Sequence, residues 1–123
     1  MDVRISDAEL GVMEALWAAG QPLTAAEVSE RIGTDREWTL ATVKTMLSRL
    51  AAKGALKHRE DGRRFLYSPA IERDAYVGNE SRRFVDKLFG GRLSPLVARL
   101  AEEDALDEED IAAIEALLKE LKS

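Results

Sequence analysis

The order of two hydrophobic periodicities in the first 70 residues constrains the fold of this 123-residue chain more than any other feature. Three short stretches place apolar residues three and four positions apart, which makes one face of a helix apolar. A stretch of alternating apolar residues follows, and that spacing is typical of a strand. The helical stretches begin after Ser6, Thr24 and Thr39, and they end at glycines (Gly20, Gly33 and Gly54). The pattern predicts three packed helices followed by β-structure.

Local signals mark where these three helices start. Ser6 with Glu9, and Thr24 with Glu27, have the spacing of a capping box, in which each side chain accepts a hydrogen bond from the other residue's backbone N–H. Thr39 is the predicted N-cap of the third helix, because its oxygen can accept from an unpaired N–H of the first turn.

A β-hairpin is predicted directly after the third helix. Residues 55–59 and 64–68 are its expected strands, and Phe65 and Tyr67 alternate in the second. The segment Glu60–Arg63 between them is typical of a turn. Three helices and a hairpin in this order form a winged helix-turn-helix, whose third helix lies in the major groove of DNA. We therefore predict a mainly α fold, with this domain at residues 1–70.

Residues 71–123 are predicted to form a second, helical domain. Helices are expected over residues 71–89, after a cap at Ser94 followed by proline, and from Asp107 onward. Their apolar faces can be buried internally or against a second copy. A tail of about fifty residues makes a poor core alone, which favours a homodimer held by apolar side chains (Phe84, Leu88, Leu100, Ile111, Ile114, Leu118 and Leu121).

The charge is unevenly distributed along the chain. The net charge is −5, which by itself argues against a nucleic-acid partner. Residues 36–64, however, carry eight basic and three acidic side chains, a balance of +5, whereas residues 71–123 carry eight and thirteen, a balance of −5. A ligand responds to the local potential, so the basic segment is the expected contact with DNA.

The third helix and the hairpin supply the candidate contacts to double-stranded operator DNA. Short hydroxyl side chains can meet base edges, threonine methyl groups can touch thymine methyl groups, and cations can reach phosphates or guanine. The candidates are Thr39, Thr42, Lys44, Thr45, Ser48, Arg49, Arg63 and Arg64.

Other functional classes find little support in the sequence. The chain has no cysteine and one histidine, His58, and it shows no nucleophile–base pair, glycine-rich phosphate loop or metal-ligand spacing. We therefore expect neither an enzyme nor a cofactor or metal. The absence of a long apolar run or a signal segment predicts a cytoplasmic protein with no membrane insertion. A winged-helix module that binds protein instead of DNA remains the alternative.

Three segments carry a family resemblance. Residues 5–17 (ISDAELGVMEALW), 38–56 (WTLATVKTMLSRLAAKGAL) and 62–69 (GRRFLYSP) resemble the first helix, recognition helix and wing of the penicillinase repressor (BlaI/MecI) family. The resemblance is looser in the tail. It implies a homodimeric repressor on palindromic operators of β-lactamase-type or related stress genes, and it places DNA contacts on the same third-helix and hairpin residues.

The resemblance also implies a mode of release. In familiar members, a membrane sensor metalloprotease triggers cleavage of an Asn-Phe bond in the tail, and the alignment puts Arg99-Leu100 at that place. Two further departures stand out. Leu40-Ala41 replaces a Pro-Lys pair after the helix cap, and the cysteine cluster of the copper-responsive relatives is absent.

Overall fold

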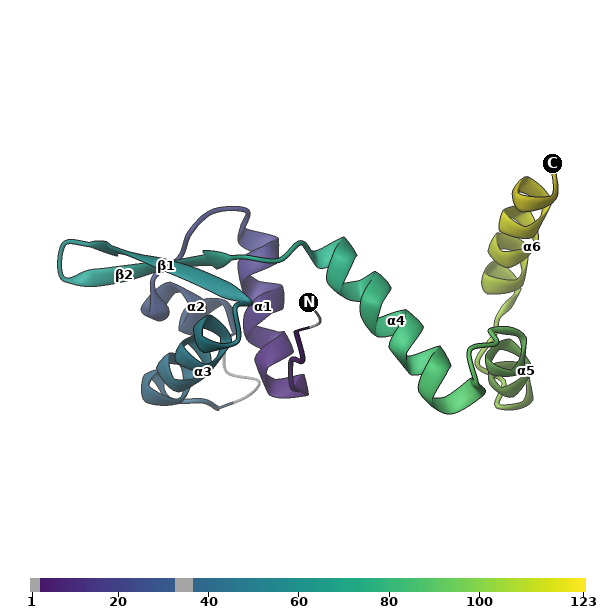
Figure 1. Ribbon diagram of the computed structural model, residues 1–123, viewed down its shortest axis with the longest axis horizontal. Coiled ribbons are helices and arrows are strands. Elements are labelled where there is room, and N and C mark those ends of the chain that lie inside the picture. The colour runs from purple at the N-terminus through teal and green to yellow at the C-terminus, as the bar shows by residue number, and fades with distance from the viewer. Residues whose placement is uncertain (1–2, 33–36) are drawn as a thin grey trace. The chain divides into compact units, whose positions relative to one another are not determined.

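The computed structural model describes residues 3–32 and 37–123. Their elements are α1 (Asp7–Ala19), α2 (Ala25–Ile32), α3 (Leu40–Ala52), β1 (Leu56–Asp61), β2 (Arg64–Pro69), α4 (Arg73–Phe89), α5 (Ser94–Glu102) and α6 (Glu108–Lys122) (Figure 1). The order of three helices, a hairpin and further helices confirms the predicted mainly α class. The chain forms two compact units, residues 1–77 and 78–123. This division lies inside α4, later in the chain than the boundary expected after residue 70.

The predicted caps of the first unit are present. The Ser6 hydroxyl accepts from the Glu9 amide at 3.1 Å, and the Glu9 carboxylate accepts from the Ser6 amide at 2.9 Å. Thr24 and Glu27 make the same pair of bonds before α2. The Thr39 hydroxyl accepts from the Thr42 amide at 3.1 Å and caps α3. The first helix ends at Gly20, as predicted, whereas Gly33 lies outside the described residues.

Every fully buried apolar side chain that the structure describes lies in the first unit. The core takes side chains from all three helices and from the start of the hairpin: Val12, Met13, Leu16, Leu23, Val28, Val43, Leu47, Leu50, Ala55 and Leu56. A short bridge joins the start of α2 to the hairpin, since Leu23 and Tyr67 exchange backbone hydrogen bonds of 2.9 and 2.7 Å. The core and this bridge hold α3 and the hairpin in a fixed relation.

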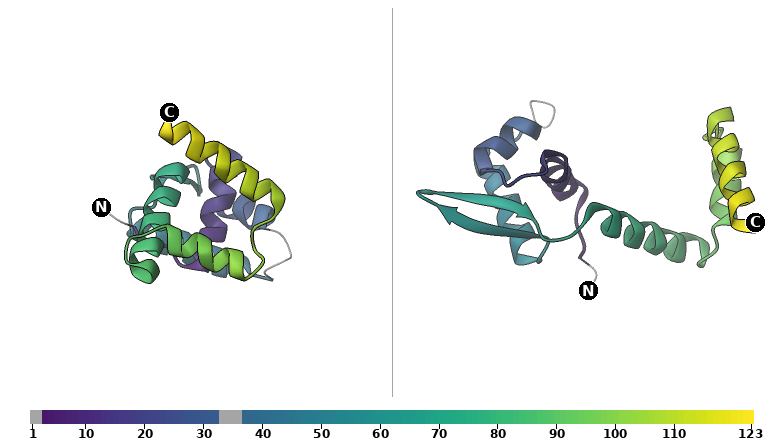
Figure 2. Two further views of the ribbon diagram at one scale, coloured as in Figure 1. Left: turned by 90° about the vertical axis from the view of Figure 1, so that its right-hand side faces the viewer. Right: turned by 90° about the horizontal axis from the view of Figure 1, so that it is seen from above.

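The hairpin turn is tighter than predicted. Strands β1 and β2 pair antiparallel from Leu56↔Pro69 to Asp61↔Arg64, so the turn comprises residues 62 and 63 alone. The expected four-residue turn over Glu60–Arg63 was therefore wrong in extent. Gly62 has a φ of +67°, a conformation that a two-residue hairpin turn needs and that glycine adopts without strain. Figure 2 shows the paired strands reaching beyond the helices of this unit.

The second unit consists of helices without a buried core. None of the described side chains of α4, α5 and α6 is buried. Asp107 caps α6 through a capping box with Asp110, in agreement with the predicted start. The predicted cap Ser94 was wrong, because Ser94 is the first residue of α5 and Leu93 precedes it without a side-chain cap. Proline fits there because the first turn's N–H groups have no partner within the helix.

Candidate nucleic-acid interface

Helix α3 presents a row of short side chains opposite its buried face. Val43, Leu47 and Leu50 face the core. Since each residue turns the helix by about 100°, the opposite row consists of short, exposed residues (Ala41, Thr45, Ser48 and Ala52). Short residues on the outermost row allow a helix to approach base edges closely in a major groove.

Two threonine hydroxyls of α3 bond within the helix. The Thr45 hydroxyl donates to the Ala41 carbonyl at 3.1 Å. The hydroxyls of Thr39 and Thr42 lie 3.1 Å apart and share a hydrogen bond. These local bonds compete with any bond that the same groups make to a ligand.

The cations on this face differ in their partners. Within residues 3–32 and 37–123, Lys44, Arg49 and Arg63 have no ion-pair partner, and all three are exposed. Arg64 instead donates from Nε and Nη2 to one Asp61 oxygen, at 3.1 and 3.0 Å. The two side chains are 63% and 44% exposed, so the pair contributes little stability, but it orients the Arg64 guanidinium.

The charge of Arg64 also acts on the start of α2. The pKa of Glu27 lies below its ordinary value, chiefly because Glu27 accepts a hydrogen bond from the Thr24 amide. The Thr24 side chain and the positive charge of Arg64 lower it further. The wing arginine therefore lies near α2 as well as at the end of the hairpin.

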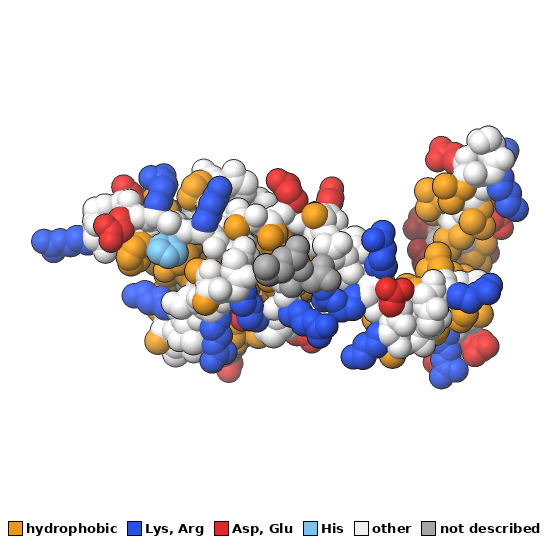
Figure 3. Space-filling model, viewed as in Figure 1, with side chains coloured by type: hydrophobic (Ala, Val, Ile, Leu, Met, Phe, Trp, Pro, Cys, Tyr) orange, Lys and Arg blue, Asp and Glu red, His pale blue; other side chains and the backbone are white. Residues whose placement is uncertain are grey.

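A groove separates α3 from the hairpin. It is lined by Thr24, Ala25, Ala26, Leu40, Lys44, Ser48, Arg63, Arg64, Phe65 and Tyr67. Four predicted DNA contacts thus lie together here, two from α3 and two from the hairpin. Figure 3 shows basic side chains at the end of the hairpin and along the helices beneath it, with apolar atoms between them. A cationic edge beside an apolar floor suits a sugar–phosphate strand.

The remaining predicted contacts lie outside this groove. Thr42 and Arg49 project from the other flank of α3, and Thr39 is at its N-cap. The groove also contains two side chains that the sequence reasoning missed, Leu40 and Phe65, which are 42% and 43% exposed. The alternation of Phe65 with Tyr67 showed that they share a face, but only the packed structure shows that this face lines the groove beside α3.

One cation of the basic segment, Lys53, contacts the first helix and not the groove. The Lys53 ammonium contacts Glu9 Oε1 at 2.5 Å and donates to the Arg4 carbonyl at 3.0 Å. Glu9 is only 2% exposed. Burial raises the pKa of Glu9, but the hydrogen bond from Lys53 and those from Ser6 outweigh burial and hold the pKa below its ordinary value. Lys53 therefore joins the end of α3 to the start of α1 and does not belong to the interface.

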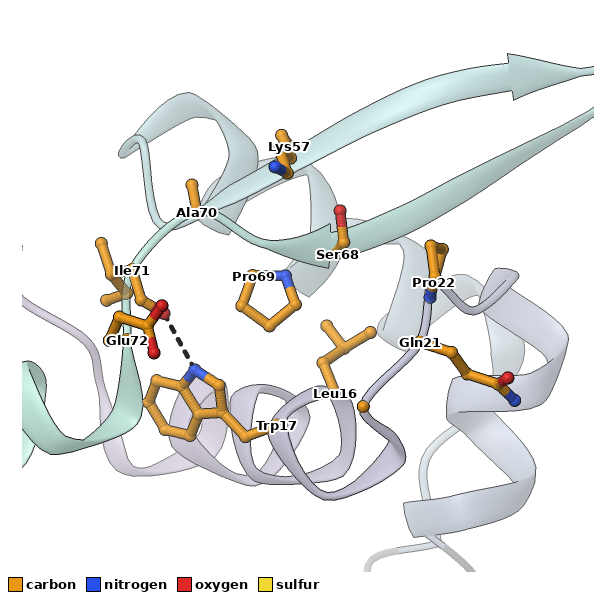
Figure 4. Close-up of a pocket in the computed structure, with 11 residues that line it drawn as sticks. Leu16, Trp17, Gln21, Pro22, Lys57, Ser68, Pro69, Ala70, Ile71 and Glu72 are labelled. Atoms are coloured by element: carbon orange, nitrogen blue, oxygen red, sulfur yellow. Dashed lines mark hydrogen bonds between the residues drawn. The ribbon is translucent and has the colours of Figure 1, made fainter.

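A second hollow lies at the end of the hairpin from which α4 follows (Figure 4). Leu16, Trp17 and Pro22 line it on one side, and Ser68 and Pro69 of β2 on the other. The Trp17 indole donates to the Ile71 carbonyl at 3.0 Å and anchors the segment that precedes α4. In the described ranges, no three His, Cys, Asp or Glu side chains are placed to hold a metal ion.

The predicted dimer contacts of the second unit are accessible. Phe84, Leu88, Leu100, Ile111, Leu118 and Leu121 are exposed, and Ile114 is half-buried. Leu93 and Leu117, which the sequence reasoning did not select, are also exposed. In the part of the chain that the structure describes, no helix is long and apolar enough to cross a membrane.

The residues at the expected cleavage position lie within α5. The Arg99 guanidinium is 3.6 Å from a Glu102 oxygen and 3.7 Å from a Glu103 oxygen. Leu100 is 37% exposed. The bond between Arg99 and Leu100 is thus accessible but helical.

Similarity to known proteins extends along nearly the whole chain. A family model described as penicillinase repressor matches residues 5–120. The penicillinase repressor of Bacillus licheniformis is 36% identical over 120 residues, 98% of this chain and 93% of that protein. The methicillin resistance regulatory protein MecI of Mammaliicoccus sciuri is 28% identical over 114 residues, 93% of this chain and 92% of that protein.

A solved structure matches part of the chain. It is the solution structure of the monomeric form of BlaI from Bacillus licheniformis in complex with the blaP half-operator. The two are 41% identical, with a TM-score of 0.51, over 59% of this chain and 88% of that one.

Proposed function

The chain belongs to the penicillinase repressor family and is a DNA-binding transcriptional repressor, and we propose that it acts as a homodimer on a palindromic operator. Membership of this family excludes an enzyme and favours the DNA reader over the protein-binding module. We further propose that the operator controls β-lactamase-type or related stress genes, as the names of the relatives suggest.

The observation that carries the proposal is the cationic groove between α3 and the hairpin. Lys44 and Ser48 line it from one side and Arg63 from the other. With α3 in the major groove, Thr45 and Ser48 face base edges, whereas Thr42, Lys44 and Arg49 lie on the flanks, where the two cations reach phosphates. Arg63 contacts the adjacent backbone, and Arg64 exchanges Asp61 for a phosphate.

The homodimer is supported by the exposed apolar side chains of the second unit. Leu88, Leu118 and Leu121 are 57%, 49% and 81% exposed, although each leucine gains about 1.5–3 kcal/mol when fully buried. A second copy with the same apolar faces would cover them. The BlaI monomer on a half-operator is consistent with a full site that takes two copies.

Release of the operator is proposed to follow cleavage between Arg99 and Leu100. A membrane sensor metalloprotease is the proposed partner in this step. Cleavage there would remove α6, and with it Ile111, Leu118 and Leu121, from the DNA-binding unit. Because the bond is helical, α5 must open locally before a protease can accept it.

Fluorescence anisotropy tests the repressor proposal. The labelled probe is duplex DNA from upstream of the protein's own gene, with a scrambled duplex of the same composition as the control. We expect roughly thousandfold tighter binding to the upstream duplex and a steep loss of affinity with added salt. Equal affinity for the two duplexes would contradict operator recognition there, and no binding to either would favour the protein-interaction module.

A further inference from the structure

We infer that Thr45 reads the operator through its methyl group, so that its Cγ2 contacts the C5-methyl group of a thymine, while its hydroxyl serves the helix. This inference rests on the proposed function, because it assumes that α3 enters the major groove. It adds a specificity-determining residue and names the chemical feature of the DNA that this residue recognises.

The position of Thr45 on α3 is the first argument. Thr45 is exposed on the row opposite Val43, Leu47 and Leu50, the side chains that α3 buries in the core. A residue there faces the base edges when the helix lies in the groove. Lys44 instead lies on the flank beside the hairpin, where it lines the groove between α3 and the hairpin and can reach a phosphate.

The hydrogen bond of Thr45 is the second argument. Its hydroxyl donates to the Ala41 carbonyl, four residues earlier, at 3.1 Å. A threonine in a helix has two accessible rotamers, and this bond selects the one that turns Oγ1 to the backbone. The proton is then engaged within the helix, and Cγ2 occupies the other branch of Cβ. The group that Thr45 offers to a base is therefore chiefly a methyl group.

The neighbours of Thr45 leave that methyl group accessible. Ala41 precedes it by one turn, Ser48 follows it by one turn, and both are exposed. Because both side chains are short, a base can approach Cγ2 without displacing a longer residue. The thymine C5-methyl group is the apolar feature of the major groove, and cytosine lacks it. Two methyl groups in contact would exclude water from both.

Thr42 serves as an internal comparison on the same helix. Its hydroxyl also bonds locally, to Thr39 at 3.1 Å, but Thr42 is half-buried and lies away from the outermost row. A local hydroxyl bond alone is therefore not sufficient for a threonine to contact a thymine methyl group. Thr45 combines that bond with the exposed central position.

Two matched variants separate the roles of the methyl group and the hydroxyl. Thr45→Ser keeps the hydroxyl and deletes the methyl group, whereas Thr45→Val keeps a methyl group at the same branch and deletes the hydroxyl. The full-length wild-type protein first selects a duplex from a random-sequence library. That duplex is then resynthesised with deoxyuridine in place of each thymidine of one half-site in turn, which removes a single C5-methyl group per probe.

We expect one deoxyuridine position to weaken wild-type binding about fourfold, the factor corresponding to one buried methyl group. Thr45→Val should retain this loss, and Thr45→Ser should bind the thymidine and deoxyuridine probes equally. Circular dichroism of both variants checks that α3 is folded.

Other outcomes would overturn the inference. These are a wild type insensitive to every deoxyuridine, a Thr45→Ser variant that keeps the discrimination, or a Thr45→Val variant that loses binding while Thr45→Ser retains it. Failure of the wild type to enrich any sequence would instead contradict the proposed function, so the two failures are distinguishable.

Discussion

At the scale of single residues, the contact between Lys53 and Glu9 shows how a cation of the basic segment acts on folding. A buried carboxylate is costly unless it is paired and hydrogen-bonded, and Glu9 receives bonds from Ser6 and Lys53. The pair connects the start of α1 to the end of α3, and Lys53 also bonds the Arg4 carbonyl of the N-terminal segment. Its effect on DNA binding is indirect, because it fixes the position of α3.

Loss of the Lys53 charge should destabilise the fold. Lys53→Met keeps most of the aliphatic chain but leaves Glu9 buried without its cation, so the free energy of unfolding should fall by about 1–3 kcal/mol. Urea denaturation followed by circular dichroism measures this change. Lys57→Met, at an exposed strand position, is the matched control and should stay within about 0.5 kcal/mol of the wild type. Equal effects of the two substitutions would show that the pair does not stabilise α1 against α3.

Acid should weaken the fold through the same carboxylate. The pKa of Glu9 is lower in the folded chain than its ordinary value of 4.5. The unfolded chain therefore takes up the proton first as the pH falls, and stability is lost from about that ordinary value down through the folded pKa. Urea midpoints measured between neutral pH and acid test this. Glu9→Gln should show a shallower decline below the ordinary pKa than the wild type, and an identical decline would assign the acid sensitivity to other groups.

At the scale of elements, the hairpin places its two neighbouring arginines in different surroundings. Gly62 and Arg63 form the turn, so Arg63 projects from the tip, whereas Arg64 belongs to β2 and is held by Asp61. A cation that must first leave a carboxylate gains less from a phosphate than an unpaired one. The tight turn thus makes Arg63 the stronger wing contact.

Substitution of the two wing arginines should reveal this difference. Arg63→Ala should weaken binding to all duplexes alike and reduce the salt slope by about one, because one phosphate contact is lost. Arg64→Ala should have a smaller effect on both, because Arg64 must give up its contact with Asp61 before it can reach a phosphate. Anisotropy titrations at several salt concentrations compare them. A larger effect of Arg64→Ala would indicate that Arg64, and not Arg63, is the main wing contact.

The recognition helix itself is tested by Arg49→Ala. Arg49 is exposed and has no ion-pair partner among the residues that the structure describes, so its removal should leave the fold and the dimer intact. Operator affinity should fall, because a phosphate contact on the flank of α3 is removed. Sedimentation velocity and anisotropy measure the two properties separately. Wild-type operator affinity in this variant would contradict the assignment of α3 as the recognition helix.

At the scale of the whole molecule, the two units differ in how far their apolar side chains are buried, which suggests that one unit binds DNA and the other forms the dimer. Among the residues that the structure describes, ten apolar side chains form the buried core of the first unit, whereas the second unit has exposed leucines on all of its helices. A chain with such faces is stable in water when they are covered. Dimerisation would cover them and would also bring two recognition helices to one operator.

A charge placed in the apolar face of α6 tests this arrangement. Leu118→Asp should produce monomers and much weaker operator binding, because an aspartate cannot be buried between apolar side chains without a large desolvation cost. Ala116→Asp introduces the same charge on the opposite side of α6 and should leave the dimer intact. Sedimentation equilibrium gives the mass of both. An unchanged mass for Leu118→Asp would place the dimer contacts elsewhere.

What the sequence determined by itself was local. The starts of α1, α2 and α3 were predicted because capping bonds join residues within one helical turn. The alternation of Phe65 and Tyr67 predicted the second strand for the same reason. Ser94 was the exception, since proline in the first turn does not show whether the serine before it lies outside or inside the helix.

Only the tertiary structure decided which of these residues meet. Lys53 and Glu9 are 44 positions apart, and the lining of the groove comes from α2, α3 and the hairpin together. Periodicity specifies the face of each element but not the element packed against it. Burial of Leu47 and Leu50 in the shared core fixes the distances between α1, α3 and the hairpin. These distances decide that Lys53 meets Glu9 while Lys44 lines the groove, and that Phe65 lies beside α3.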